Sequence, residues 1–78
     1  MTKEQVQEYI IGILKSQTKL DNITPDMDMM DDIGIDSMHL FALTSVLEKE
    51  YGVKLSTRIF RNVSTVEDLA ELIISKIG

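Results

Sequence analysis

Residues 32–52 read DIGIDSMHLFALTSVLEKEYG, and this stretch contains the end of a loop, a complete helix and the residue that stops it. Asp36 is a favoured N-cap residue and Gly52 suits the left-handed conformation that ends many helices, so the stretch predicts a helix from residues 36–37 to about residue 51. Apolar side chains at helical spacing define the expected inward face, made of Leu40, Leu43, Leu47 and Tyr51, with Phe41 beside them. Ser37 then lies in the first turn, where backbone N–H groups point outward.

The residues before this stretch predict one more helix and a long loop. Thr2 and Gln5 have the spacing of a capping box, and a helix over roughly residues 3–16 follows, with an apolar face made of Val6, Ile10, Ile13 and Leu14. Residues 20–36 show no periodicity and hold Pro25, Gly34, six Asp and no basic residue. We expect the apolar residues of this loop to fold back onto the core, namely Met27, Met29, Met30, Ile33 and Ile35.

The residues after Gly52 predict a short helix and a final long one. The segment TRIFRN, residues 57–62, is long enough for one short helical turn. Either Ser64 or Thr65 caps the last helix, because Glu67 and Asp68 follow them at capping-box spacing. The apolar stripe of this helix consists of Val66, Leu69, Ala70, Ile73 and Ile77. The fold class is therefore all-α, with three main helices, one short helix and a long loop after the first.

The composition limits what this chain can do. Its 78 residues, 44% of them hydrophobic, allow a single domain over residues 1–78 with a thin core and no roomy internal active site. It has no Cys, which excludes disulfides and thiolate metal sites. The net charge of −5 argues against nucleic acid as a partner and favours basic protein surfaces. No signal peptide or long apolar run is present, so we expect a cytoplasmic protein that does not enter a membrane.

The segment Asp32-Ile33-Gly34-Ile35-Asp36-Ser37-Met38 strongly resembles the attachment motif D/E-x-G-x-D-S-L of acyl carrier proteins. The resemblance extends over the whole chain, through its length, its acidity, the long loop, the Tyr51-Gly52-Val53 ending and the segment STVEDL at residues 64–69. It implies a four-helix bundle whose serine carries 4′-phosphopantetheine, which holds acyl groups as thioesters. Carried over to this chain, it makes Ser37 the attachment site, Asp36 the carboxylate beside it and Gly34 the turn residue.

The residues themselves favour a carrier over an enzyme. A nucleophilic serine needs a base within reach, but the single histidine, His39, is two helical steps from Ser37 and rotated about 200° from it. The resemblance implies that a separate phosphopantetheinyl transferase modifies Ser37, using coenzyme A and Mg²⁺. Acyl-loading and acyl-processing enzymes would be the further partners of a chain that we expect to be a monomer. Two alternatives stay open, an aminoacyl or peptidyl carrier and an unmodified helical interaction subunit.

The chain departs from the family pattern in its second helix. Carriers of fatty-acid synthases usually place acids two and five residues past the serine, where this chain has His39 and Ala42. Its helix has no acid between Asp36 and Glu48, although the steering charge could instead lie in the acidic loop. We therefore expect an apolar docking surface and a specialised fatty-acid or polyketide pathway. The predicted docking residues are Met38, Leu40, Ala42 and Ile59, and the predicted lining of an acyl pocket is Met30, Leu47 and Ile59.

Two further groups of charged residues bear on metal binding and on partner contacts. The acidic loop does not have the spacing of a calcium-binding EF-hand loop. Counted from Asp26, position 6 of such a loop would be Asp31 instead of Gly, and position 12 would be Ser37 instead of Glu. No metal site is therefore predicted. Arg58 and Arg61 form a local basic spot that could be a solvated face, a partner contact or a pairing with the acidic loop.

Overall fold

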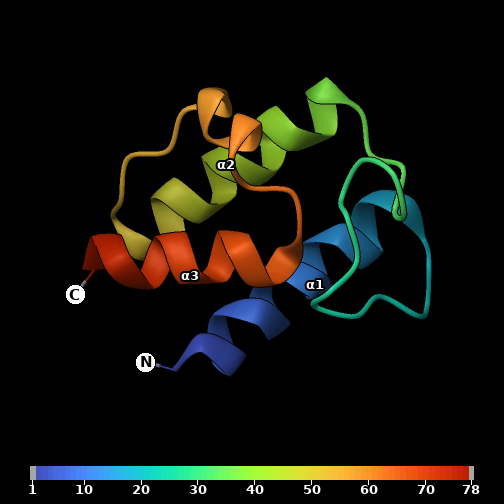
Figure 1. Ribbon diagram of the computed structural model, residues 1–78, viewed down its shortest axis with the longest axis horizontal. Helices are drawn as coiled ribbons and strands as arrows, with labels where there is room; N and C mark the ends of the chain where they lie inside the picture. The colour runs from blue at the N-terminus through green and yellow to red at the C-terminus, as the bar shows by residue number, and fades with distance from the viewer. Residues whose placement is uncertain (1, 78) are drawn as a thin grey trace.

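The computed structural model describes residues 2–77 and contains three α-helices and one 3-10 helix. These are α1 (Lys3–Thr18), α2 (Ser37–Tyr51), η1 (Thr57–Arg61) and α3 (Val66–Ile77), arranged as Figure 1 shows. The predicted all-α architecture and the bounds of the second helix are confirmed. Among the helices of this part of the chain, none combines the length and the apolar character needed to cross a membrane.

α1 extends two residues beyond the helix predicted over residues 3–16. Its start is as predicted, because Thr2 and Gln5 form both bonds of a capping box. Its end is set by Lys19, which adopts a left-handed conformation with φ 62° and donates its N–H to the Lys15 carbonyl at 2.8 Å. A lysine at this position gives no sequence signal comparable to the glycine that ends α2 at Gly52, where φ is 64°.

The core lies among the three α-helices, and α1 contacts both α3 and α2. Side chains of all three helices and of the long loop are fully buried there, and the largest are Val6, Ile10, Leu14, Met29, Leu43, Leu47, Val66, Leu69 and Ile73. Two expected core positions are wrong, since Phe41 is 65% exposed and Ile77 is 44% exposed. Thr44 takes the inward position on α2, because it falls between Leu40 and Leu47 on the buried stripe while Phe41 is turned toward solvent.

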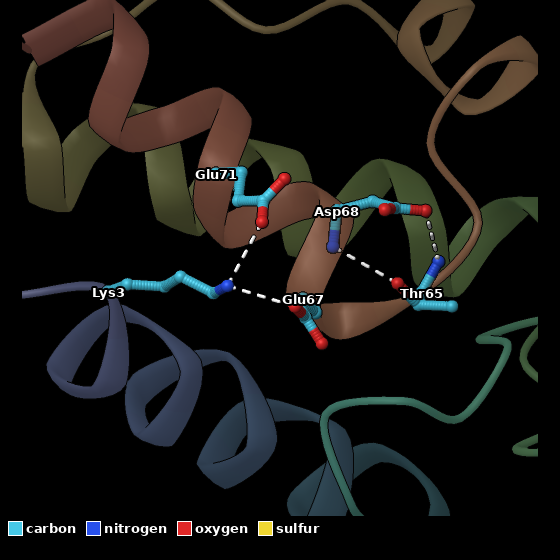
Figure 2. A network of polar contacts seen from close by, with 5 residues as sticks. All are labelled: Lys3, Thr65, Glu67, Asp68 and Glu71. Atoms are coloured by element: carbon cyan, nitrogen blue, oxygen red, sulfur yellow. Dashed lines mark hydrogen bonds and ion pairs between the residues drawn. The ribbon is translucent and has the colours of Figure 1, made fainter.

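An exposed ion-pair cluster joins the start of α1 to the first turns of α3. Lys3 Nζ lies 2.9 Å from Glu67 Oε1 and 3.0 Å from Glu71 Oε1, as Figure 2 shows. Hydrogen bonds to these two carboxylates raise the pKa of Lys3 above its ordinary value. Solvent screens such exposed pairs, so the buried apolar faces of α1 and α3 contribute most of the attraction between the two helices.

Thr65, rather than Ser64, caps α3. Its hydroxyl oxygen accepts the Asp68 N–H at 3.0 Å, and Asp68 Oδ2 accepts the Thr65 N–H at 3.4 Å (Figure 2). Asp68 Oδ2 also accepts the Ser64 N–H at 3.4 Å. Glu67, the candidate partner of Ser64, instead contacts Lys3. The backbone bonds from Ser64 and Thr65 lower the pKa of Asp68 below its ordinary value.

Substituting Asp68→Asn is expected to destabilise the fold at neutral pH by less than about 1 kcal/mol, because Asp68 is the capping-box partner of Thr65 and solvent screens its carboxylate. Because the pKa of Asp68 is lowered in the folded chain, its carboxylate stabilises the fold above the unfolded pKa and loses this effect as pH falls through the folded one. Urea unfolding at several pH values should therefore show that the difference in unfolding free energy between the wild type and Asp68→Asn shrinks below about pH 4. A difference that is constant with pH would contradict the assignment. Glu8→Gln, at an exposed position of α1, is the control.

The long loop is anchored to the start of α3. Met29 donates its N–H to the Ser64 carbonyl at 2.8 Å, next to an isolated bridge between Asp28 and Thr65. Glu67 N–H, which has no helical partner in the first turn, donates to the Pro25 carbonyl at 2.9 Å. The expected return of the loop's apolar side chains to the core is confirmed for Met27, Met29, Ile33 and Ile35, and Ile23, which was not predicted, is buried there as well. Met30 is the exception, with 52% of its surface exposed.

Two of the loop's acids order its backbone. Asp28 Oδ1 accepts the N–H groups of Met30 at 2.9 Å and Asp31 at 2.8 Å, while Asp32 Oδ2 accepts the Asp28 N–H at 2.8 Å. Such side-chain bonds to nearby amides are typical turn contacts of aspartate. Among residues 2–77, no three His, Cys, Asp or Glu side chains are grouped to hold a metal ion.

Candidate functional site

The loop delivers its last residues to the start of α2 in a fixed conformation. Ile33 N–H donates to the Asp28 carbonyl at 3.0 Å, and Ile35 N–H donates to the Met29 carbonyl at 3.1 Å. Between them Gly34 has φ 82°, a left-handed value that L side chains rarely adopt. A Cβ at Gly34 would meet no atom within 4 Å, so the turn requires glycine for its backbone conformation and not for lack of space.

Asp36 caps α2 and places Ser37 at its first helical position. The Asp36 backbone is extended, and its Oδ1 accepts the His39 N–H at 2.9 Å, as the sequence predicts for an N-cap. This bond is the main reason that the pKa of Asp36 lies below its ordinary value. Ser37 itself is exposed, so its hydroxyl is accessible to a second protein.

The side chain of His39 lies against Asp36 and is not the base of a nucleophilic Ser37. Its Nδ1 lies 3.1 Å from Asp36 Oδ1, and its carbonyl accepts a hydrogen bond from Gln17 Nε2 of α1 at 3.0 Å. Sequence reasoning placed His39 away from Ser37 but missed its pairing with Asp36. The sequence did contain a signal for this contact, because Asp36 and His39 are three residues apart, a spacing at which side chains of a helix come close together.

The amino-acid sequence of residues 8–73 matches the family described as "Phosphopantetheine attachment site". The chain belongs to the phosphopantetheine-binding acyl carrier protein family. It is 33% identical to the polyketide-8 synthase acyl carrier protein 2 of Streptomyces avermitilis, over 100% of this chain and 87% of that one. It is also 29% identical to an acyl carrier protein of Thermotoga maritima, over 99% and 98% of the two chains.

Solved structures agree with this assignment at the level of the fold. The acyl carrier protein of Enterococcus faecalis superposes with a TM-score of 0.79 at 24% identity, over 97% of this chain and 99% of that one. The family carries its cargo without catalysing a reaction. Phosphopantetheine is its cofactor, and the start of α2 in this acyl carrier protein fits that group, since Ser37 offers an exposed hydroxyl at a helix start, where the helix dipole favours negative charge.

The predicted docking residues divide between the surface and the core of this carrier. Met38 is 79% exposed and Ala42 is exposed, whereas Leu40 is only 5% exposed and packs inward, which removes it from any docking surface. Ile59 is half-buried and packs against the core. Sequence reasoning missed two exposed apolar residues on the same side of α2, Phe41 at 65% and Val46 at 40%. Together Met38, Phe41, Ala42 and Val46 form what we call the apolar face of α2.

The predicted acyl-pocket residues also separate. A pocket of about 220 Å³ opens between the loop and the end of η1 with the segment that follows it, and its lining is Asp28, Met29, Met30, Asp31, Phe60, Val63 and Ser64. Met30 belongs to the lining of this pocket. Leu47 is completely buried in the core, and Ile59 packs against the core outside the lining. Phe60 and Val63 supply apolar side chains to the lining of this pocket.

Proposed function

We propose that Ser37 is the residue that carries 4′-phosphopantetheine, and that the chain presents acyl groups, held as thioesters on this arm, to partner enzymes. The observation that carries the proposal is the position of Ser37, which is exposed at the first position of α2 directly after the Asp36 cap. A phosphate bonded to Ser37 Oγ would face the free amides and the positive end of the helix dipole.

The arm would supply a group that the chain lacks. There is no Cys in the sequence, so a thioester requires the thiol of the arm. A tethered acyl group reaches each bound enzyme at a high effective concentration, which suits a protein that transfers cargo from one active site to the next. The pocket beside the loop is a candidate to receive part of that cargo. Met29 lines this pocket, and its carbonyl accepts the N–H of Ile35, which is two residues before Ser37.

The test of this proposal is the intact mass of the purified chain after incubation with coenzyme A and a broad-specificity phosphopantetheinyl transferase. We expect the mass of one arm to be added to each chain. A folded sample that gains no mass would instead favour the alternative of an unmodified interaction subunit.

We propose further that the cargo is an acyl group of a specialised fatty-acid or polyketide type. Two observations support this assignment, the similarity to a polyketide synthase carrier and the absence of acids on α2 between Asp36 and Glu48. An aminoacyl or peptidyl carrier is the alternative. Incubating the arm-bearing chain with an acyltransferase and, separately, with an amino-acid-activating enzyme would distinguish them, because only the matching enzyme should load a thioester.

The apolar face of α2 is the proposed docking surface for partner enzymes. Phe41→Ala is expected to lower kcat/KM of the transferase for this chain by about tenfold, or about 1.4 kcal/mol, because large exposed aromatic residues commonly dominate interfaces. Ile77→Ala, on α3, is the matched control, since Ile77 is also an exposed apolar residue. Equal losses for the two variants, measured as initial rates against carrier concentration, would contradict docking through α2.

A further inference from the structure

One segment of this acidic chain carries only positive charge. Residues 51–66 contain no Asp or Glu and hold three of the chain's eight Lys and Arg residues, namely Lys54, Arg58 and Arg61. Residues 20–36, in contrast, hold six Asp and no basic residue. Both arginines lie on η1, which also has no acid. The net charge of −5 therefore conceals a local positive region on η1.

The geometry of η1 directs its two arginines to the same side. A 3-10 helix has about three residues per turn, so side chains three positions apart lie one above the other. Ile59 packs against the core and Phe60 lines the pocket, which accounts for two sides of η1. Arg58 and Arg61 share the remaining side, and both are exposed. The fold therefore presents two guanidinium groups together to solvent.

These two arginines have no carboxylate partner within residues 2–77. The ion pairs of that part of the chain are made by Lys3 and His39. The pairing with the acidic loop that the sequence left open is therefore absent there. Two like charges side by side repel each other, so an anion that contacts both Arg58 and Arg61 is attracted by each and reduces their repulsion.

The neighbouring helix offers nothing that would attract a basic partner to this side. η1 packs against α2, as Figure 1 shows. Residues 37–47 of α2 carry no acid, and the first acid, Glu48, accepts the Leu55 N–H at 3.0 Å. A basic surface would therefore meet no carboxylate on η1 or on residues 37–47, whereas an acidic surface would meet two arginines.

We infer that Arg58 and Arg61 form an anion-binding side of η1 that pairs with carboxylates on the surface of a partner enzyme, so that this carrier docks onto an acidic protein surface. This inference rests on the proposed function, in which the chain presents acyl groups to partner enzymes. Guanidinium groups suit the role, because they match a carboxylate with two parallel hydrogen bonds. A carboxylate on the cargo is a poorer occupant, since Asp28 and Asp31 line the pocket beside Phe60 and would repel it.

The test uses two amphipathic helical peptides as probes, each with leucine on one side and either glutamate or lysine on the other. NMR signals of the backbone and of the arginine side chains are followed as each peptide is added to the wild-type chain at low salt. We expect the glutamate peptide to move the signals of η1, including both guanidinium groups. The lysine peptide should instead move the signals of residues 20–36. Binding of the glutamate peptide should weaken as salt is added, because salt screens exposed charges.

Arg58→Gln combined with Arg61→Gln is the test variant. Lys15→Gln combined with Lys76→Gln, at exposed positions of α1 and α3, is the matched control. Both variants lose two positive charges, so the effect of net charge on an acidic probe is the same in each. We expect the arginine variant to bind the glutamate peptide roughly three- to tenfold more weakly than the wild type, and the control less than about twofold more weakly.

Equal losses for the two variants would overturn the inference, as would a lysine peptide that binds η1 more tightly than the glutamate peptide does. Glutarate, added at the carboxylate concentration of the peptide, tests for a small ligand. If it moves the guanidinium signals as far as the peptide does, the arginines bind small carboxylates and a protein partner is not supported.

Thermal unfolding shows whether either variant loses its fold, and the signals of the wild type test the location of the site without any substitution. If the wild type gains no arm from the transferase, the proposed function fails. The peptide titration needs no arm, so it still decides whether η1 binds an acidic surface.

Discussion

Ser37→Ala is expected to abolish attachment of the arm, leaving the chain at its unmodified mass after full conversion of the wild type. The reason is chemical, because the phosphodiester needs the Oγ atom and no neighbouring residue offers a hydroxyl at the same position, since Asp36 and Met38 flank it. Intact-mass spectrometry after incubation with coenzyme A and the transferase measures the result. The rate of arm attachment to Ser37→Ala should be undetectable and not merely reduced.

Ser45→Ala is the matched control for this experiment, because Ser45 is also exposed on α2, two turns further along. It should acquire the arm as completely as the wild type. Neither substitution removes a side chain from the core, so both variants should unfold at nearly the wild-type temperature. An arm that still appears on Ser37→Ala would place the attachment site elsewhere and remove the central assignment.

Leu47→Ala is expected to cost roughly 2–5 kcal/mol of unfolding free energy. Leu47 is completely buried in the layer between α2 and its neighbours, and its truncation removes apolar contacts and leaves a cavity. A small domain has a total stability of only about 5–15 kcal/mol, so this loss is a large share of it. Urea unfolding followed by circular dichroism measures the change through the midpoint and slope.

Met38→Ala serves as the control for Leu47→Ala, since Met38 is on the same helix but 79% exposed. Its truncation should change the unfolding free energy by less than about 0.5 kcal/mol. The comparison also tests the location of the pocket. If Leu47→Ala costs no more than Met38→Ala, Leu47 lines an open cavity, as the sequence suggested, instead of the packed core.

Local signals determined the helices of this protein and the place of its attachment motif. The span of α2 follows from the Asp36 cap, the Gly52 stop and the leucines between them, all of which act within a few residues of one another. The start of α1 follows in the same way from the Thr2 and Gln5 capping box. Ser37 lies at a helix start for the same reason, so the candidate site was predictable from the sequence.

Several features of the site depend on contacts between distant segments. Ser64 and Thr65 were equally good caps of α3 by spacing, and the choice of Thr65 coincides with Lys3 of α1 contacting Glu67. The loop's course is fixed by its bonds to the start of α3, which no periodic pattern records. The pocket joins the loop to the segment after η1, so its lining could not be assembled from either segment alone.

The sequence by itself determined the start of α1, the span of α2 and the place of Ser37, because capping, turn formation and helical periodicity are short-range effects. The tertiary structure alone decided which apolar side chains are covered. Phe41 and Leu40 are adjacent and both apolar, yet one is exposed and the other is buried. Helical periodicity gives a helix an apolar side, but the segments that pack against α2, α1 and η1 among them, set the edges of that side. Residues at an edge are therefore assigned only when these neighbours are in place.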